Sequence, residues 1–189
     1  MTSLADEKQL ARKAGFAQRK LAHHSQTDAA GQAAAQFMRW LGNQNFNIVA
    51  GYMPIRTEID VLPLMHTLHL RGMNICVPVI VAKGMPLKFR QWTPSCDMEN
   101  GPFGAPVPTS GDWLLPDLML CPLISFDLTS QRLGYGGGFY DRSLEQLRAA
   151  KPVTALGYAY AGQQVDTVPS EHTDQPLDGM VTERGVTMF

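Results

Sequence analysis

A cluster of glycines framed by arginines is the stretch of the chain best suited to chemistry. Residues 132–142 read RLGYGGGFYDR, with four glycines in five positions ahead of a segment that favours a helix. The first N–H groups of a helix lack intrahelical partners and its dipole is positive there, so phosphate is favoured. Glycine lets the backbone curl into a concave nest close to a ligand. The stretch predicts an anion site, although a strand-to-helix turn with unusual dihedrals explains the spacing equally well.

The residues beside the glycines favour the anion site. The stretch matches neither common phosphate fingerprint, because Phe139 fills the last glycine position of G-x-G-x-x-G and no G-K-[ST] follows. Arg132 and Arg142, however, can pair with phosphate oxygens. Asp141 can hold a hard cation such as magnesium. An aspartate in a first helical turn also compensates the dipole by about 0.3–1 kcal/mol, so Asp141 alone decides nothing.

Other polar residues are weaker candidates when each is taken alone. Lys8 and Arg12 lie four residues apart on one face of a predicted helix, where they can hold a polyanion or simply face solvent. Glu58 follows a predicted strand, and open α/β sheets place ligands at the carboxyl ends of strands. An acid at that point also suits the start of a helix. Asp174 lies in the polar segment SEHTDQPLD (170–178), where a surface residue without a role is the default.

The elements that must position these residues alternate between helices and strands. Two helices open the chain, one after a capping box at Ser3-x-x-Asp6 and one after Ser25-x-x-Asp28. Apolar periodicity predicts further helices at 60–71 and 140–149, strands at 46–54, 74–81, 86–92, 117–126, 153–158 and 177–183, and an irregular loop over 93–116. In the first helix the apolar stripe would be Leu10, Ala14, Ala17 and Leu21.

This alternation, with continuous apolar strands, predicts an α/β fold. We expect a layered open sheet, largely parallel, with helices on both faces and preceded by two N-terminal helices. The length of 189 residues predicts a single domain over 1–189.

Composition argues against several functional classes. The net charge of −1 gives no reason to expect a nucleic-acid partner, and no apolar run is long enough to cross a bilayer. The N-terminus lacks the apolar core of a secretory signal. Three cysteines without a C-x-x-C pair indicate free thiols in a reducing compartment. We therefore expect a cytoplasmic protein, a monomer or weak homodimer, with neither nucleic acid nor membrane as partner.

Taken together, the segments resemble the 5-formyltetrahydrofolate cyclo-ligase family (methenyltetrahydrofolate synthetases). RLGYGGGFYDR is similar to the family signature R-L-G-x-G-x-G-[YF]-Y-D. The K-x-x-x-R of Lys8 and Arg12, then YMPIRTEID, DLMLCPLISFD and VPSEHTDQPLD, follow in the order of the family. The resemblance covers nearly the whole chain.

The resemblance implies an enzyme that uses ATP and Mg²⁺ to convert 5-formyltetrahydrofolate into 5,10-methenyltetrahydrofolate, with release of ADP and phosphate. The formyl oxygen of an amide is a poor leaving group. Phosphoryl transfer to that oxygen would let the 10-nitrogen attack the formyl carbon, and phosphate would then depart as the ring closes. In phosphoryl transfer the protein mainly positions reactants and neutralises charge.

The resemblance also implies roles for particular residues. Those expected to contact ATP are Lys8, Arg12, Arg132, Gly134, Tyr135, Gly136, Gly137, Gly138 and Phe139. Those expected to contact the folate are Met53, Glu58, Tyr135, Phe139 and Tyr140. Arg132 and Tyr140 are expected to serve catalysis, and Asp141 and Asp174 to hold Mg²⁺. The chain departs from the family pattern at Gly137, where some members carry lysine, and at Val107, where an acidic residue is frequent.

Two other functional classes stay open. A non-catalytic folate or nucleotide binder on the same fold would be expected to lack phosphate or metal groups, yet Lys8, Arg12, Arg132 and Asp141 are all present. A sugar-phosphate isomerase-like enzyme on a similar fold would need neither ATP nor Glu58, since fold alone does not fix function. Release of ADP on addition of a formyl-folate distinguishes that enzyme from the ligase.

Overall fold

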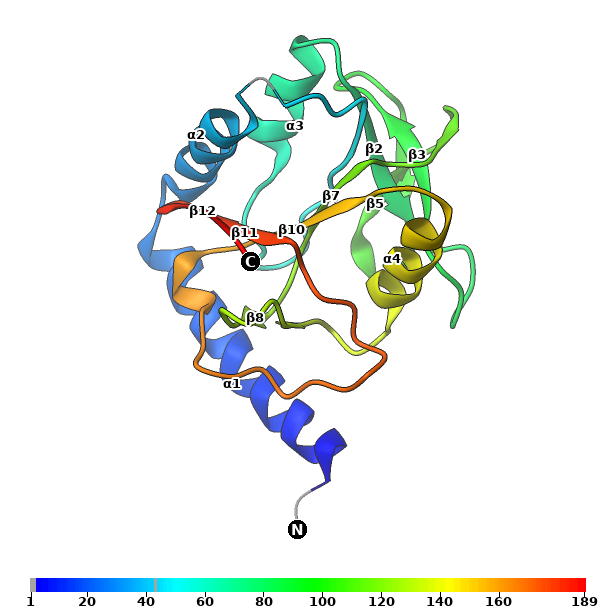
Figure 1. Ribbon diagram of the computed structural model, residues 1–189. Helices are drawn as coiled ribbons and strands as arrows, with labels where there is room; N and C mark the ends of the chain where they lie inside the picture. The colour runs from blue at the N-terminus through cyan, green and yellow to red at the C-terminus, as the bar shows by residue number, and fades with distance from the viewer. Residues whose placement is uncertain (1–2, 43) are drawn as a thin grey trace.

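A single eight-stranded sheet forms the framework of the computed structural model, which describes residues 3–42 and 44–189 (Figure 1). From one edge to the other the sheet contains β12 (Gly185–Met188), β11 (Gly179–Thr182), β10 (Thr154–Tyr158), β7 (Leu118–Cys121), β1 (Ile48–Ala50), β2 (Asn74–Val79), β3 (Lys88–Trp92) and β6 (Trp113–Leu114). The strands from β11 to β2 are parallel, and antiparallel pairs complete both edges. The predicted open, largely parallel sheet is confirmed.

Helices cover both faces of this sheet. Helices α2 (Ala29–Leu41) and α3 (Leu62–Leu70) lie on one face, and α4 (Phe139–Ala150) lies on the other (Figure 1). Alternate residues of β1 show the two layers, because Val49 joins the core beneath α2 and α3 whereas Ala50 joins the core beneath α4. Strands with apolar residues on both faces are typical of a sheet covered on both sides.

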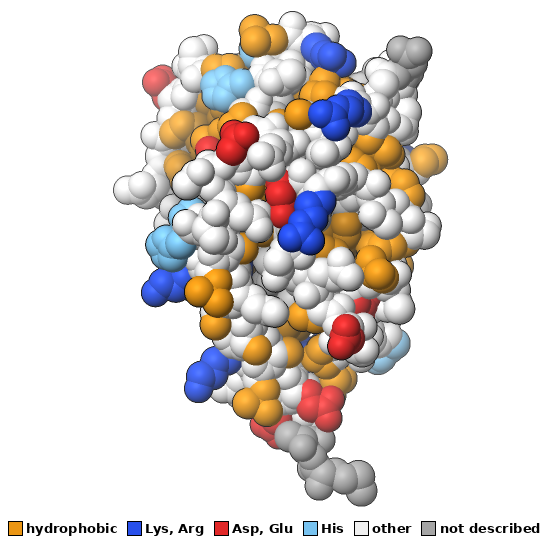
Figure 2. Space-filling model, turned by 90° about the vertical axis from the view of Figure 1, so that its left-hand side faces the viewer, with side chains coloured by type: hydrophobic (Ala, Val, Ile, Leu, Met, Phe, Trp, Pro, Cys, Tyr) orange, Lys and Arg blue, Asp and Glu red, His pale blue; other side chains and the backbone are white. Residues whose placement is uncertain are grey.

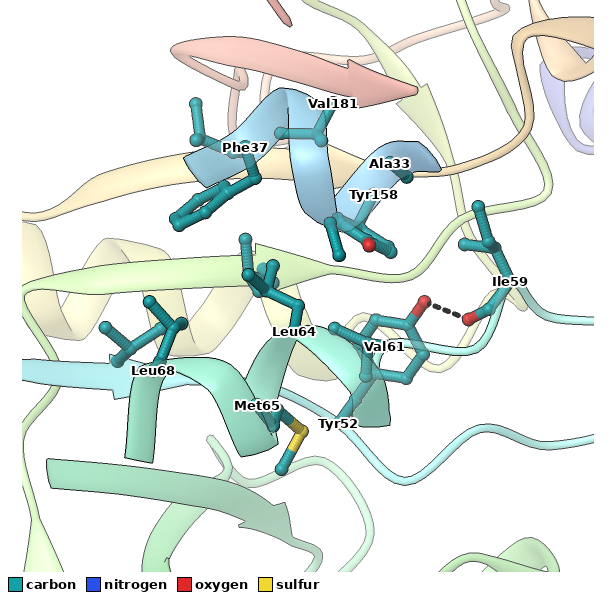
Figure 3. Close-up of a cluster of buried hydrophobic side chains, with 14 of the residues drawn as sticks. Ala33, Phe37, Tyr52, Ile59, Val61, Leu64, Met65, Leu68, Tyr158 and Val181 are labelled. Carbon is teal, nitrogen blue, oxygen red and sulfur yellow. Dashed lines mark hydrogen bonds between the residues drawn. The ribbon is translucent and has the colours of Figure 1, made fainter. Parts of the chain in front are cut away.

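The larger core cluster lies between the sheet and helices α2 and α3. Phe37 of α2 and Leu64 of α3 point toward Tyr158 and Val181 of the sheet (Figure 3). Each of these four side chains is at most 1% exposed. Burying a large apolar side chain contributes about 1.5–3 kcal/mol, so this cluster is the main source of stability for that layer.

The same core anchors the segment between β1 and α3. The Tyr52 hydroxyl donates a hydrogen bond of 2.7 Å to the carbonyl of Ile59, drawn as a dashed line in Figure 3. Both side chains are buried. This bond fixes the turn that carries Glu58 at the carboxyl end of β1.

Helix α1 (Leu4–Ser25) begins at the predicted capping box: the Ser3 Oγ accepts from the Asp6 N–H at 3.2 Å. The predicted apolar stripe, however, is wrong, because Leu10 and Leu21 are 64% and 70% exposed. The buried residues of the helix are instead Lys8, Gly15, Arg19 and Ala22. Most of α1 lies against loops that follow the carboxyl ends of the strands rather than against the sheet, so its polar face is turned inward.

Residues 93–116 do not form the predicted irregular loop. They contain β4 (Met98–Asn100), the 3₁₀ helix η1 (Pro102–Gly104) and β5 (Pro106–Pro108), with β4 and β5 paired antiparallel, and they end in the edge strand β6. The short sequences Met-Glu-Asn and Pro-Val-Pro carry no strand pattern of their own. Their pairing depends on partners that a local reading does not reveal.

The strand predicted for 117–126 is two strands. After β7 the chain turns and forms β8 (Ser125–Phe126), which pairs antiparallel with β9 (Arg132–Leu133). The predicted strand at 177–183 corresponds to β11, but β12, which follows it, was not predicted. A second 3₁₀ helix, η2 (Ala161–Gln163), packs against α1.

The surface gives no strong charge field on the side where α1 and α2 lie. Basic and acidic side chains are interspersed on the face shown in Figure 2, with apolar side chains among them. No helix in residues 3–42 and 44–189 combines the length and the apolar character needed to cross a membrane.

Candidate active site

The glycine stretch forms a loop between β9 and α4. Gly138 is the N-cap residue of α4 and has a left-handed backbone with φ 63°, and Gly136 has φ 90°. These positive φ values favour glycine over every other residue. The loop therefore presents the N-terminus of a helix of 12 residues at the carboxyl end of the sheet. The predicted strand–loop–helix arrangement is confirmed, with the helix beginning at Phe139.

A buried aspartate holds the hairpin that leads into this loop. The Asp127 carboxylate, 1% exposed, accepts hydrogen bonds from the N–H groups of Thr129 (2.8 Å), Gln131 (3.2 Å) and Val168 (2.8 Å). Burial alone would raise the pKa of Asp127, but these hydrogen bonds outweigh it and the pKa lies below its usual value. Asp127 thus ties the β8–β9 hairpin to the segment that follows η2.

Arg12 of α1 lies directly against the glycine loop. Its Nε donates to the carbonyl of Gly134 at 3.0 Å. A Cβ at Gly136 would lie 3.2 Å from the Arg12 guanidinium. The approach of α1 is allowed by Gly15, where a Cβ would lie 2.6 Å from Ile124. The helix is therefore close enough to place a cation over the loop.

Two further arginines, Arg132 and Arg142, also contact the loop or the helix that follows it. Arg142 Nη2 donates to the carbonyl of Gly137 at 2.6 Å, and its guanidinium lies 5.4 Å from the centre of the Phe139 ring. In the part of the chain that the structure describes, the buried Nε of Arg142 has no hydrogen-bond partner. Arg132 Nη2 donates to Asp141 Oδ1 at 2.7 Å. The loop thus brings arginine side chains to the N-terminus of α4, where the first N–H groups of a helix lack intrahelical partners.

The two predicted metal ligands are each paired with a cation. Asp141 Oδ1 accepts from Arg132, and Asp174 Oδ2 lies 2.7 Å from the Lys8 Nζ, which also contacts Glu171 at 2.6 Å. The segment that carries Asp174 runs past the N-terminal half of α1 (Figure 1). Within residues 3–42 and 44–189, no three His, Cys, Asp or Glu side chains gather as a metal site.

Lys8 is charged and almost fully enclosed. It is 8% exposed. Burial alone would lower the pKa of Lys8, but its bonds to Asp174 and Glu171 outweigh the burial and raise the pKa above the usual value. The ammonium group is therefore fixed in its protonated form between Glu171 and Asp174.

Glu58 is a buried carboxylate that touches the glycine loop through Tyr135. Its side chain accepts from the Ile55 N–H at 2.9 Å through Oε2 and from the Tyr135 hydroxyl at 3.0 Å through Oε1. The residue is 7% exposed, and burial raises the pKa of Glu58 above its usual value. A carboxylate with free acceptor positions is suited to a ligand that offers two parallel N–H donors.

Arg19 is the residue that sequence reasoning missed. Its Nη2 donates to the Tyr135 hydroxyl at 2.7 Å, and its Nη1 lies 3.8 Å from Glu58 Oε1. The sequence does contain a pattern that indicates it: Lys8, Arg12 and Arg19 are spaced so that they lie on one face of α1. Burial raises the pKa of Tyr135 to about 12, so its hydroxyl keeps its proton.

The other residues predicted to contact the folate lie at the margins of the two hydrophobic core clusters. Met53 is half-buried and packs against the cluster beneath α2 and α3. Phe139 and Tyr140 are half-buried and pack against the cluster beneath α4. Burial raises the pKa of Tyr140 well above its usual value, so its hydroxyl is a hydrogen-bond donor and not a base.

An open α/β sheet with a basic, glycine-lined helix N-terminus at the carboxyl ends of its strands is suited to binding a phosphate-bearing ligand. The model of the 5-formyltetrahydrofolate cyclo-ligase family matches residues 5–183, and the chain belongs to that family. The predicted family and enzyme class, a cyclo-ligase of folate one-carbon metabolism, are confirmed.

Individual relatives agree with the family model. The 5-formyltetrahydrofolate cyclo-ligase of Escherichia coli K12 is 32% identical over 171 residues, which cover 87% of this chain and 93% of the relative. That of Haemophilus influenzae is 35% identical over 136 residues, or 68% and 72% of the two chains. The solved structure of Aquifex aeolicus 5,10-methenyltetrahydrofolate synthetase superimposes with a TM-score of 0.76 at 26% identity, over 96% of this chain and 92% of that one.

Proposed function

We propose that the protein converts 5-formyltetrahydrofolate and MgATP into 5,10-methenyltetrahydrofolate, ADP and phosphate. The observation that carries this proposal is the hydrogen bond of 3.0 Å between Tyr135 and Glu58. Tyr135 belongs to the glycine loop, so one residue joins the proposed phosphate site to the proposed pterin site. A reaction between a nucleotide and a folate needs both reactants held side by side.

The nucleotide phosphates would bind at the N-terminus of α4. Arg12 and Arg132 supply charge there, and the loop from Gly134 to Gly138 supplies backbone N–H groups. Arg142 adds a specific reason, because its buried Nε lacks a partner among the described residues. An unpaired buried donor costs about 1–3 kcal/mol, and a phosphate oxygen would satisfy it. Lys8 would contact the phosphates by exchanging one of its two carboxylate partners.

The residues present also fit a magnesium ion. Mg²⁺ is usually held by one or two carboxylates together with substrate phosphates, and when bound it neutralises phosphate charge. Asp141 and Asp174 offer that number of carboxylates. The contacts of Asp141, from Arg132 at 2.7 Å and the Gln175 N–H at 3.1 Å, both involve Oδ1. Its Oδ2 would be the oxygen that faces the metal.

The pterin ring would bind at Glu58. An ionised carboxylate has about four acceptor sites. The bonds from Ile55 and Tyr135 use two of these sites. Two remain for the amino group and the adjacent ring N–H of the pterin, and Met53 would pack against the ring. Such a pairing strongly penalises a ligand that lacks these donors.

The chemical step would proceed as a transfer followed by ring closure. The formyl oxygen attacks the terminal phosphorus and ADP leaves. The 10-nitrogen then attacks the formyl carbon and gives up its proton, and phosphate departs with the carbon–oxygen bonding pair. Arg132 would stabilise the negative charge of the transferred group, and the neutral Tyr140 hydroxyl would donate a hydrogen bond beside the folate.

The test is direct. The protein is mixed with 5-formyltetrahydrofolate and MgATP, and the near-ultraviolet absorbance of the methenyl product is followed. A rise that requires both ATP and magnesium supports the proposal. An absence of product while calorimetry still detects folate binding would favour the non-catalytic binder instead.

The glycine loop gives a first prediction. Gly136→Ala places a Cβ 3.2 Å from the Arg12 guanidinium, on a backbone with φ 90° that alanine rarely adopts. We expect the KM for ATP to rise about tenfold, because about 1–3 kcal/mol of strain falls on the phosphate loop. The matched control is Gly134→Ala, where a Cβ meets nothing within 4 Å. Equal effects of the two substitutions would show that the conformation of Gly136 and its contact with Arg12 are not what supports ATP binding.

A further inference from the structure

A fully buried arginine behind the proposed pterin site has no role in the mechanism so far. We infer that Arg19 is a positioning residue that keeps Glu58 ionised and in place for pterin binding, and so controls the affinity for the folate. This inference rests on the proposed function, because it assumes that Glu58 receives the pterin. It adds a residue of α1 to a site otherwise built from the loops after β1 and β9 and the start of α4.

The contacts of Arg19 converge on Glu58 and its surroundings. Arg19 is 1% exposed. Its Nε donates to Thr57 Oγ1 at 3.1 Å, directly beside Glu58, and its Nη1 donates to the carbonyl of Leu123 at 3.3 Å. Its Nη2 donates to the Tyr135 hydroxyl, which in turn donates to Glu58. The guanidinium thus holds both the carboxylate segment and the tyrosine that orients the carboxylate.

Aromatic rings fix the guanidinium in this position. Its central carbon lies 5.4 Å from the centre of the Phe16 ring and 5.4 Å from the centre of the Tyr135 ring. Cation–π contacts of this kind contribute more when the cation is desolvated. Arg19 is therefore a preorganised charge and not a flexible surface cation.

The charge of Arg19 matters because Glu58 is buried. An uncompensated buried carboxylate binds a proton, and a protonated Glu58 would turn its O–H toward the pterin N–H donors. The titratable and charged groups around Glu58 are Arg19 of α1, Arg56 of its own segment, Tyr52 next to β1, Tyr135 of the glycine loop and Tyr140 of α4. Only the two arginines in this set are cations, and Arg56 is exposed, so its charge is screened.

Arg19 could support Glu58 by its shape alone or by its charge, and the two roles predict different pH dependences of folate binding. Replacing a buried charge by an apolar side chain of similar size can leave stability nearly unchanged, provided its partner is also replaced. Arg19→Met leaves Glu58 in place without its cation. The Glu58 carboxylate should therefore bind a proton at a higher pH than it does in the wild type. Arg19→Lys restores the charge but not the forked geometry. The two variants therefore separate charge from shape.

The experiment measures folate binding by calorimetry, without ATP, and the KM for folate from pH 6 to 8.5. For Arg19→Met we expect binding to weaken by about tenfold or more on going from pH 8 to pH 6, because neighbouring cations hold carboxylates ionised. Wild type and the exposed control Lys20→Met should change much less over this range. Arg19→Lys should restore most of the wild-type pH profile, and the KM for ATP should stay within about twofold.

A loss of folate binding that is equal at all pH values, and equal in Arg19→Met and Arg19→Lys, would overturn the inference. If Arg19→Met does not fold, Arg19→Gln provides the neutral variant, and its pH profile decides in the same way. An inactive wild type would refute the proposed reaction but not the role of Arg19, since calorimetry of folate binding still tests that role.

Discussion

Replacing Glu58 by glutamine should lower kcat/KM for 5-formyltetrahydrofolate by about 10²- to 10⁴-fold. Hydrogen bonds to a charged group contribute about 1.5–3 kcal/mol each, and the substitution removes the anion that would accept two of them. Glutamine also turns an N–H₂ group toward the N–H donors of the pterin. Arg19 would lose its anionic partner at 3.8 Å, which adds to the cost.

Steady-state kinetics with each substrate varied in turn tests this prediction. We expect the KM for ATP to stay close to the wild-type value, because the arginines at the glycine loop are untouched. Glu99→Gln is the control, since Glu99 is an exposed glutamate in β4. A loss of less than tenfold for Glu58→Gln would show that the pterin does not bind this carboxylate.

The central part of the fold could be predicted from the sequence because its signals are local. Strands β1, β2, β7 and β10 are continuous apolar runs, which are typical of parallel strands buried on both faces. The residues of β4 and β5 lack such a pattern. Their pairing is set by contacts with each other and with β3, so it becomes visible only in three dimensions.

Helix α1 shows why periodicity alone misleads. The stripe that includes Leu10 and Leu21 was expected to face the core, as in an amphipathic helix on a sheet. The helix instead packs on loops that follow the strands. There Lys8 donates hydrogen bonds to carboxylates, and Arg19 donates to a carbonyl and a hydroxyl. Charged residues can be buried on that face because each of them is paired there.

The candidate site was predictable by residue type but not by pairing. RLGYGGGFYDR indicates an anion loop through its glycines and arginines. It does not indicate that Tyr135 reaches Glu58, 77 residues away in the chain. Nor does it indicate that Asp141 pairs with Arg132, because β9 and α4 meet only after the loop has folded.

This pairing makes Asp141→Asn the most informative change on the phosphate side. Asparagine keeps an oxygen for Arg132 and the Gln175 N–H but loses the negative charge offered to Mg²⁺. We expect kcat to fall by about 10²- to 10³-fold, the usual effect of removing one electrostatic group from a transition state. The magnesium concentration for half-maximal rate should rise as well.

The chain offers a matched control in Asp178→Asn. Asp178 Oδ2 accepts from Arg148 at 2.9 Å and from the Ala155 N–H at 2.7 Å, the same pattern as Asp141 but with an arginine that does not belong to the glycine stretch. Both substitutions weaken one arginine pair, so both should lower the thermal midpoint by about 5 °C or less. Only Asp141→Asn should impair turnover. Near-normal turnover of that variant at low magnesium would remove Asp141 from the proposed metal site and leave it as a partner that orients Arg132.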